Sequence, residues 1–353
     1  MLLGLSEALP SLVEAKFRSA KAAQSLIFSP TELAVIRTSA GIPFQLRYCP
    51  ALAKKPVAKK GDAAPAAIRP DPFDNPPADL LIARIPHDDP SHLLVLNKYP
   101  VIAGHFILAT KANKPQTHAL EEDDLEAAYA CLQAWQGDDV RGGPRRLFAF
   151  FNSGDHSGAS QPHRHLQFLP LENMKENGGP ASPWDLLIDL ILASPEAGSE
   201  DLSSRLIQHP DLPFTHFALK LPPATKGAEL LAAYQTLYTS AKEAVDKFIA
   251  TNPGSLTLHP SAEGHLPISY NLAMTTVGMA ILPRRSEGGS LQRDGGTELG
   301  FIALNGTTLG GTLMVKHQEE WDLLRAQPEK LQSILAAIGI PRDLRTGKLR
   351  AQV

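Results

Sequence analysis

The densest group of polar side chains in the chain lies in the run NSGDHSGASQPHRHLQ. If the end of this run is a β-strand, His163, His165 and Gln167 project to the same side, because alternate residues of a strand share a face. Arg164 and Leu166 would then face the opposite side. The small residues ahead of them offer backbone N–H groups suited to cradling an anion. The pattern predicts a nucleophile beside a phosphate cradle.

The chemistry of imidazole indicates transfer of a phosphorus-containing group. A neutral histidine nitrogen can attack phosphorus, so a covalent phosphoramidate is accessible. The ordinary pKa of histidine, about 6.5, keeps much of the ring neutral near neutral pH. Its other nitrogen must donate a hydrogen bond that fixes the tautomer, commonly to a carbonyl or a carboxylate. The neighbouring histidine and glutamine could hold phosphate oxygens or protonate the leaving group.

Two other interpretations compete for this histidine pair. His-x-His on a strand is also a zinc pair, but zinc needs a third and a fourth ligand. Cys49 and Cys131 have no ligand-like neighbours, which leaves His105 and His156 to complete such a site. The second alternative is a structural, hydrogen-bonded pair, which the adjoining Gly-Ala-Ser-Gln turn disfavours.

The elements that position this run alternate between strands and helices. Strand-like segments joined by short turns, with helices inserted, predict an α+β domain with an antiparallel sheet. A first turn rich in acidic residues indicates the helix that follows residue 121. The expected strands are Ala34–Thr38, Pro43–Tyr48, His92–Asn97, Gly104–Thr110, Arg146–Asn152, Arg164–Leu171, Ser269–Thr275, Gly278–Pro283 and Gly311–Lys316, and the expected helices cover 5–17, 125–135, 230–249 and 321–335, the last divided at Pro328.

Residues 50–78 are rich in Pro, Ala and Lys and show no apolar period. This composition predicts a flexible surface loop or a solvated linker. The alternative is a mobile loop whose lysines meet an anionic ligand.

Composition and charge exclude several classes of protein. The net charge of −3 and pI of about 6.5 give no basic excess for binding nucleic acid. Two distant cysteines exclude a disulfide framework and favour a reducing compartment. No apolar run reaches about 18 residues, and the first residues lack a signal-peptide pattern, so we expect no membrane association. We expect a cytoplasmic location, with the nucleus as a second compartment.

The run SGASQPHRHLQFLP resembles the signature of the histidine-triad superfamily in its transferase branch, where glutamine replaces the third histidine. With LNKYPVIAGHFILATK, SYNLAMTT and GTLMVKHQEEWDLL, the chain resembles the fungal diadenosine tetraphosphate (Ap4A) phosphorylases, or ATP adenylyltransferases, over residues 40–340. The resemblance implies an antiparallel half-barrel sheet with flanking helices, like that of galactose-1-phosphate uridylyltransferases, in two pseudo-repeated halves. Residues 1–200 would carry the His-x-His-x-Gln motif, and residues 201–353 would complete the nucleotide site.

The same resemblance implies an activity and a set of roles. Inorganic phosphate would cleave Ap4A to ATP and ADP, reversibly, through an adenylylated histidine. The nucleophile would be His165, flanked by His163 and Gln167, which orient its ring and bind the α-phosphate. Arg284 and Arg285 are additional candidates for contacting the polyphosphate, and His156 has no assigned role. The residues implied to contact substrate are Lys55 (or its neighbour Lys54), Asn97, Lys98, Asn152, Ser153, Gly154, Ser160, Gln161, Asn271, Thr275, Gly311 and Lys316.

Partners and rival functions follow from the same comparison. We expect no protein-held metal, and Mg²⁺ to accompany the polyphosphate. The small-molecule partners are Ap4A, ATP, ADP, AMP and inorganic phosphate, with sulfate as an alternative acceptor, and a diverged duplication favours a monomer. A hexose-1-phosphate uridylyltransferase is the rival enzyme, although that branch usually has proline where this chain has Arg164. A non-catalytic nucleotide sensor is the other rival, although a pure binder needs no nucleophile.

Overall fold

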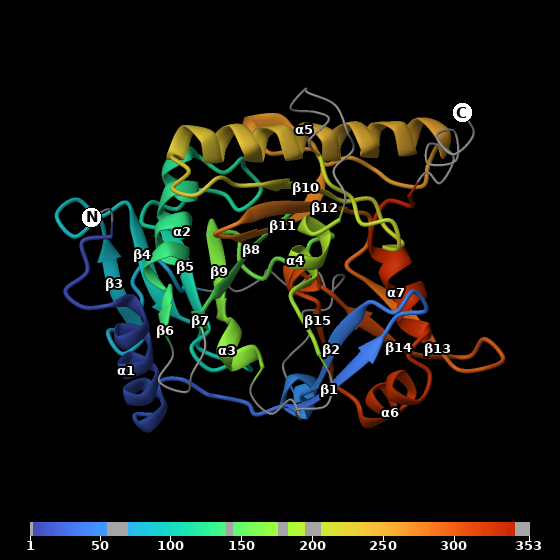
Figure 1. Ribbon diagram of the computed structural model, residues 1–353, viewed down its shortest axis with the longest axis horizontal. Helices are drawn as coiled ribbons and strands as arrows, with labels where there is room; N and C mark the ends of the chain where they lie inside the picture. Colours follow the sequence, from blue (N-terminus) through green and yellow to red (C-terminus); the bar gives the residue numbers. More distant parts are fainter. Residues whose placement is uncertain (1–2, 55–69, 139–143, 176–182, 195–205, 343–353) are drawn as a thin grey trace.

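The computed structural model describes residues 3–54, 70–138, 144–175, 183–194 and 206–342 (Figure 1). The helices are α1 Leu9–Ala22, α2 Glu122–Ala134, α3 Leu171–Met174, α4 Leu187–Leu192, α5 Gly227–Thr251, α6 Gln318–Ala326 and α7 Lys330–Ile338, with 3-10 turns η1 Pro50–Lys54, η3 Ala262–Gly264 and η4 Gly306–Gly310. The strands are β1 Glu32–Arg37, β2 Pro43–Tyr48, β3 Leu81–Ile85, β4 His92–Leu96, β5 Phe106–Thr110, β6 Gly137–Asp138, β7 Pro144–Arg145, β8 Leu147–Ser153, β9 His165–Pro170, β10 Phe217–Lys220, β11 Ser269–Thr275, β12 Gly278–Arg284, β13 Gly288–Gln292, β14 Glu298–Ala303 and β15 Thr312–Val315.

An eight-stranded sheet forms the centre of the molecule, in the order β10-β12-β11-β8-β9-β5-β4-β3. Every neighbouring pair in it is antiparallel, as predicted, and the expected pairs β4/β5 and β8/β9 are both present. Strands from the N-terminal and C-terminal halves of the chain meet where β8 pairs with β11 (Figure 1). The sheet therefore runs through both of the ranges proposed as separate regions, and that division stays a prediction.

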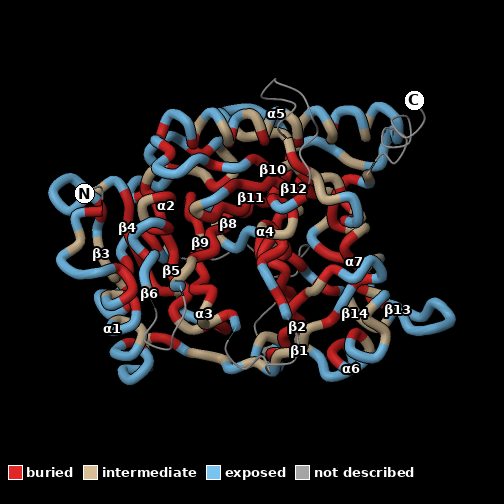
Figure 2. The backbone as a smooth tube through the Cα atoms, viewed as in Figure 1, coloured by how far each residue is buried: buried red, intermediate tan, exposed pale blue. Residues whose placement is uncertain are grey.

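Alternating side chains of the sheet enter two different cores. In β8, Leu147, Ala149 and Phe151 pack into a core shared with α1, α2 and α5. Phe148 and Phe150 point the other way, into a core shared with α4, α6, α7 and the small sheet of β1, β2 and β15. The strands at the centre of Figure 2 are accordingly buried on both faces. Ile107 and Ala109 of β5 do not belong to this second core but form a separate small cluster with Phe73, and the candidate site lies over this part of the sheet.

Several elements differ from the sequence-based expectation. Helix α1 begins at Leu9, four residues later than predicted, because Pro10 occupies its first turn. Pro328 separates α6 from α7, as predicted. The hairpin of β13 and β14 was not predicted, since its first strand, GGSLQ, has a single large apolar side chain. In the predicted loop 50–78, residues 55–69 lie outside the described part of the chain, while the stretch after them is described in detail.

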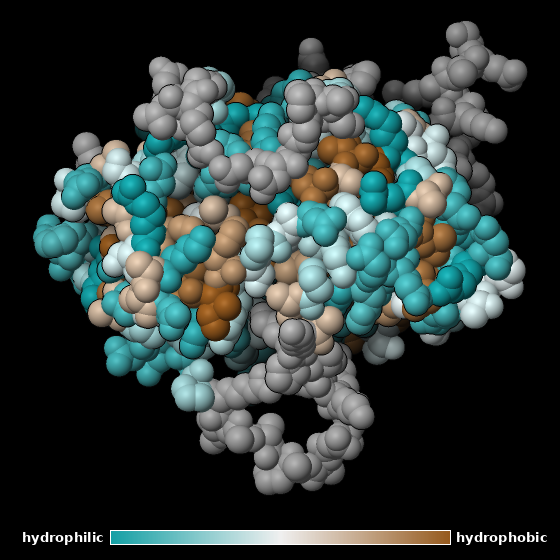
Figure 3. Space-filling view, turned by 90° about the horizontal axis from the view of Figure 1, so that it is seen from below, coloured by the Kyte–Doolittle hydropathy of each residue, from teal (hydrophilic) through white to brown (hydrophobic). Residues whose placement is uncertain are grey.

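The molecular surface is mixed in character. Seen from below, apolar side chains form separate patches among hydrophilic ones (Figure 3). Within the described residues, no helix combines the length and the apolar character needed to cross a membrane.

Candidate active site

A cavity of about 450 Å³ lies over β4, β5 and β9. This volume is typical of small-molecule sites. Its lining mixes apolar side chains, among them Phe73, Leu80, Val95 and Ile107, with polar ones. The polar residues are Asp71, Asn75, Asn97, Lys98, Tyr99, Ser160, Gln161, His165 and Gln167. The cavity therefore offers both apolar and polar contacts to a ligand.

The register of β9 places the motif on the cavity side. Gln167 lies opposite Ile107 and His165 opposite Ala109 of β5. Leu166 lies between them and enters the helix-covered core, as the alternation predicts. On the core side, the buried guanidinium of Arg164 donates to Glu121 and Asp124 at the start of α2, at 2.7 and 2.8 Å. This double ion pair fixes the strand where it enters the site.

His165 is held as a neutral imidazole. Its side chain is 3% exposed, and its Nδ1–H donates to the backbone carbonyl of His163 at 2.7 Å. Because a carbonyl only accepts, the proton of the neutral ring lies on Nδ1 and the lone pair lies on Nε2. Burial, with a smaller contribution from the charge of His163, lowers the pKa of His165 to about 4. The ring therefore has an unprotonated nitrogen throughout the neutral pH range.

The His163 ring does not line the cavity. Its Nδ1 lies 2.6 Å from Oδ2 of Asp71, and its Nε2 lies 2.7 Å from the carbonyl oxygen of Thr110. Phe73 packs edge-on against it, with ring centroids 5.5 Å apart. His163 contacts the His165 ring through the backbone carbonyl of His163. The expected contact between the His163 side chain and the α-phosphate stays a prediction.

Gln167 ends a directional chain of hydrogen bonds. The backbone N–H of Tyr99 donates to Oδ1 of Asn97 at 2.9 Å, which leaves the Asn97 amide nitrogen facing Nδ1 of His105 at 3.1 Å. Nε2–H of His105 then donates to Oε1 of Gln167 at 3.1 Å. Burial lowers the pKa of His105 to about 4, so this ring is neutral. The chain directs the acceptor end of Gln167 into the protein and reserves its NH₂ group for another acceptor.

A buried network fixes the turn that precedes the histidines. Asn271 on β11 donates to Oδ1 of Asn152 at 2.9 Å, and the backbone N–H of Gly306 donates to the same oxygen at 2.8 Å. Within the described residues, the buried amide nitrogen of Asn152 has no hydrogen-bond partner. Gly154 has φ +84°, and a side chain there would collide with Ser269. A larger residue at this position of the turn would therefore be strained.

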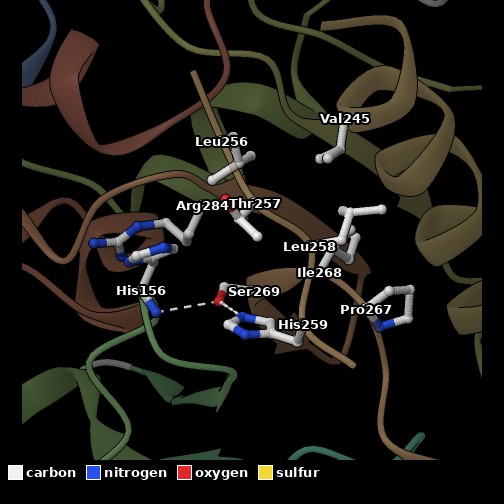
Figure 4. A pocket seen from close by; sticks show the side chains of 10 residues that line it. All are labelled: His156, Val245, Leu256, Thr257, Leu258, His259, Pro267, Ile268, Ser269 and Arg284. Atoms are coloured by element: carbon white, nitrogen blue, oxygen red, sulfur yellow. Dashed lines mark hydrogen bonds between the residues drawn. The ribbon is translucent and has the colours of Figure 1, made fainter. Parts of the chain in front are cut away.

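His156 and Arg284 serve this network rather than the cavity. The backbone N–H of His156 donates to Oγ of Ser269 at 3.1 Å, and Nε2 of His259 lies 2.7 Å from that oxygen (Figure 4). The space between these side chains is about 10 Å³, room for one water molecule. The buried guanidinium of Arg284 donates to Oδ1 of Asn271 and to the carbonyl of Leu304. Burial lowers the pKa of Arg284 to about 9.

The zinc alternative finds no support in the part of the chain that the structure describes. His105 is directed to Gln167 and His156 lies beside Ser269, so the two rings do not converge on the histidine pair. No group of three or more His, Cys, Asp or Glu side chains in the described residues could hold a metal ion.

Only some of the remaining residues predicted to contact substrate line the cavity. Asn97, Lys98, Ser160 and Gln161 line the cavity. Among the described residues predicted to contact substrate, those outside the cavity lining are Asn152, Ser153, Gly154, Asn271, Thr275, Gly311 and Lys316, while Lys55 lies outside the described range. Arg285 donates to the carbonyls of Ala336 and Ala337, at the end of α7.

Sequence reasoning missed three residues that support the motif. Gln116 accepts from the backbone N–H of His165 at 2.7 Å and donates to the carbonyl of Asn152 at 2.7 Å, so its amide links β8 to β9 where the strands separate. Asp71 and Phe73 belong to the Pro-rich segment that was interpreted only as a loop. No local pattern shows that these residues support the motif, because the partners through which they do so lie at least 36 positions away.

Comparisons with known proteins agree with this geometry. Family models described as the Ap4A phosphorylase N-terminal domain and the ATP adenylyltransferase C-terminal domain match residues 3–189 and 210–341. Diadenosine tetraphosphate phosphorylase 2 of Saccharomyces cerevisiae is 29% identical over 311 residues, 84% of each chain. Protein APA1 of the same yeast is 27% identical over 339 residues, 94% of each chain.

Solved structures extend the likeness to the fold. The crystal structure of the yeast Ap4A phosphorylase Apa2 matches with a TM-score of 0.74 at 25% identity, covering 97% of this chain and 99% of that one. The structure of Apa2 in complex with Ap4A matches with a TM-score of 0.73 over the same shares. The sheet order, the motif and both family models lead to one assignment: this chain belongs to the Ap4A phosphorylase family of ATP adenylyltransferases.

Proposed function

We propose that this protein cleaves diadenosine tetraphosphate with inorganic phosphate to give ATP and ADP, reversibly, through an adenylylated His165. The observation that carries the proposal is a buried, neutral imidazole with its lone pair on Nε2, on the wall of a cavity that also holds Lys98, Gln161 and Gln167. The names of the yeast relatives and the solved complex of Apa2 with Ap4A support this substrate.

The reaction proceeds by two displacements at one phosphorus. Nε2 of His165 attacks the α-phosphorus of Ap4A, the bond to the bridging oxygen breaks, and ATP leaves with that oxygen. An oxygen of inorganic phosphate then attacks the same phosphorus, the P–N bond breaks, and ADP leaves while His165 returns to its neutral form. Because phosphate is already ionised, the second step needs no general base.

Gln167 makes phosphate a better acceptor than water. Its NH₂ group can donate to the non-bridging oxygens, but an amide cannot relay a proton as an imidazole does. Attack by water, which must lose a proton, is therefore expected to be slow at this site.

The cavity lining contains side chains suited to each chemical group of the substrate. The apolar side chains of Phe73, Val95 and Ile107 suit an adenine ring, and Lys98 with Gln161 suits the phosphates. Charges from Lys55 and Lys316, with Mg²⁺ on the polyphosphate, would balance the rest of the negative charge.

The test is a product assay with and without phosphate. The purified protein is incubated with Ap4A, and nucleotides are separated by chromatography. With phosphate present, we expect sustained production of ATP and ADP in equal amounts. Without phosphate, we expect no ADP and at most one equivalent of ATP per protein, from the first displacement. Transfer of UMP from a UDP-hexose would favour the uridylyltransferase alternative, and binding of Ap4A without any product would favour the sensor. Release of AMP without phosphate, as fast as ADP with it, would contradict the role given to Gln167.

A further inference from the structure

We propose that Asp71 holds His163 as a doubly protonated imidazolium, and that this buried ion pair is a positioning element that supplies positive charge beside His165. The effect on rate rests on the adenylyl transfer proposed above, while the charge state of the pair does not. Both partners lie outside the reacting atoms, so neither is a catalytic residue in the strict sense.

The count of hydrogen-bond donors and acceptors leads to this charge state. Nδ1 of His163 lies 2.6 Å from a carboxylate oxygen of Asp71, and Nε2 lies 2.7 Å from the carbonyl oxygen of Thr110. A carbonyl cannot donate, and a neutral imidazole carries a single N–H, so one contact would lack a proton. The Thr110 hydroxyl, 3.1 Å from Nε2, is 2.7 Å from the carbonyl of Ala112, to which it donates.

The proton shared between Asp71 and His163 belongs to the imidazole. Histidine is the stronger base of the two by about 2.5 pKa units in model compounds. Oδ2 of Asp71 also accepts from the amide of Asn113 at 3.0 Å, which stabilises the ionised carboxylate. The His163 side chain is 1% exposed, and a buried charge of this kind persists only with a partner.

The ion pair suits a site for an anionic substrate. Asp71 lines the cavity, and an unpaired carboxylate there would repel the phosphates. The titratable groups that face the His163 ring are Asp71, from the segment before β3, and His165, from β9. A cation at His163 opposes protonation of His165 and contributes positive potential where negative charge develops on the transferring phosphate.

The charge state can be read directly from the protein as it exists. Two-dimensional NMR of ¹⁵N-histidine-labelled wild type at about pH 8 reports the protonation of every ring nitrogen, and His163→Gln assigns the signals of residue 163 by their loss. We expect both nitrogens of His163 to be protonated and one nitrogen of His165 to be unprotonated. An unprotonated nitrogen on His163 at this pH would overturn the proposal, whatever the enzyme activity.

A charge-removing substitution tests the effect on the reaction. Asp71→Asn keeps the shape and an acceptor oxygen but removes the charge that stabilises the imidazolium. We expect the rate of protein adenylylation by Ap4A at about pH 8 to fall roughly ten- to a hundredfold, as for loss of a charged hydrogen bond. The loss should shrink as the pH falls toward 5, because protons restore the cation, whereas the wild-type rate stays constant.

Asp74→Asn is the matched control, because Asp74 is exposed on the same segment. It should leave the adenylylation rate and its pH dependence unchanged. A wild-type rate in Asp71→Asn, or a loss that is the same at every pH, would overturn the positioning role. A doubly protonated His163 in a protein that does not react with Ap4A would instead refute the proposed function and leave the ion pair intact.

Discussion

Two buried histidines support His165 from opposite ends of the motif, and their ring nitrogens meet opposite kinds of partner. His163 faces two acceptors, the Asp71 carboxylate and the Thr110 carbonyl. His105 faces the donating amide of Asn97 on one side and the accepting oxygen of Gln167 on the other. Burial is similar for the two rings, at 1% and 8% exposure. Burial keeps the His105 ring neutral, whereas the acceptor at each nitrogen of His163 is the basis for proposing a cation there.

This difference indicates that the His163 end and the Gln167 end of the motif have different roles. The His163 end carries the proposed charge, and its backbone carbonyl fixes the tautomer of His165, the proposed nucleophile. The His105 end is neutral and fixes the orientation of an amide that can bind phosphate oxygens. Substitutions on the neutral end should therefore change the rate without changing its dependence on pH.

The largest effect at the neutral end is expected at Gln167. Gln167→Ala removes the amide donor, and we expect the adenylylation rate to fall about ten- to a hundredfold, since hydrogen bonds to charged groups contribute about 1.5–3 kcal/mol. Gln167→Glu keeps the acceptor for His105 but cannot donate, so it should lose at least as much. Single-turnover kinetics with labelled Ap4A measures both rates. Near-normal turnover in Gln167→Glu would show that the amide does not donate to the substrate.

A smaller effect is expected one step back in the chain, at His105. His105→Asn places an amide at the position of Nδ1 and leaves Gln167 without its donor, so we expect about a five- to tenfold lower rate, from a neutral hydrogen bond of about 1 kcal/mol. His105→Gln places an amide nitrogen near the position of Nε2 and should restore most of the rate. If both variants lose the same activity, His105 acts through packing and not through the hydrogen bond.

The smallest expected effect is that of pH on the wild-type first step. A histidine pKa lowered to about 4 means that His165 stays unprotonated, and nucleophilic, at every pH above about 4. The adenylylation rate should thus be constant from about pH 8 to 5 and fall to half near pH 4, with the fold monitored by circular dichroism. A midpoint near 6.5, the ordinary value for histidine, would show that the nucleophile is not desolvated as described.

Short-range pattern was enough to predict the sheet strands around the motif and the face on which His165 and Gln167 lie. These features depend on alternation and on turn residues, which a single segment contains. The roles of Asp71 and Gln116 could not be predicted, since each acts on residues at least 36 positions away across the sheet. Arg284 was interpreted as a candidate ligand for phosphate, but the structure has it holding Asn271 in the core. A buried arginine and an exposed one look alike in a sequence.

The identity of the nucleophile is the central claim, and covalent trapping tests it most directly. Wild type and His165→Ala are incubated with Ap4A labelled in its α-phosphates, without inorganic phosphate, and the modified peptide is identified by mass spectrometry. For the wild type, the account predicts acid-labile AMP on His165 that is released as ADP when phosphate is added. For His165→Ala, it predicts no label and a more than thousandfold loss of turnover, about the scale for losing an essential nucleophile. Label on another residue, or turnover in the variant above about a thousandth of the wild-type rate, would contradict it.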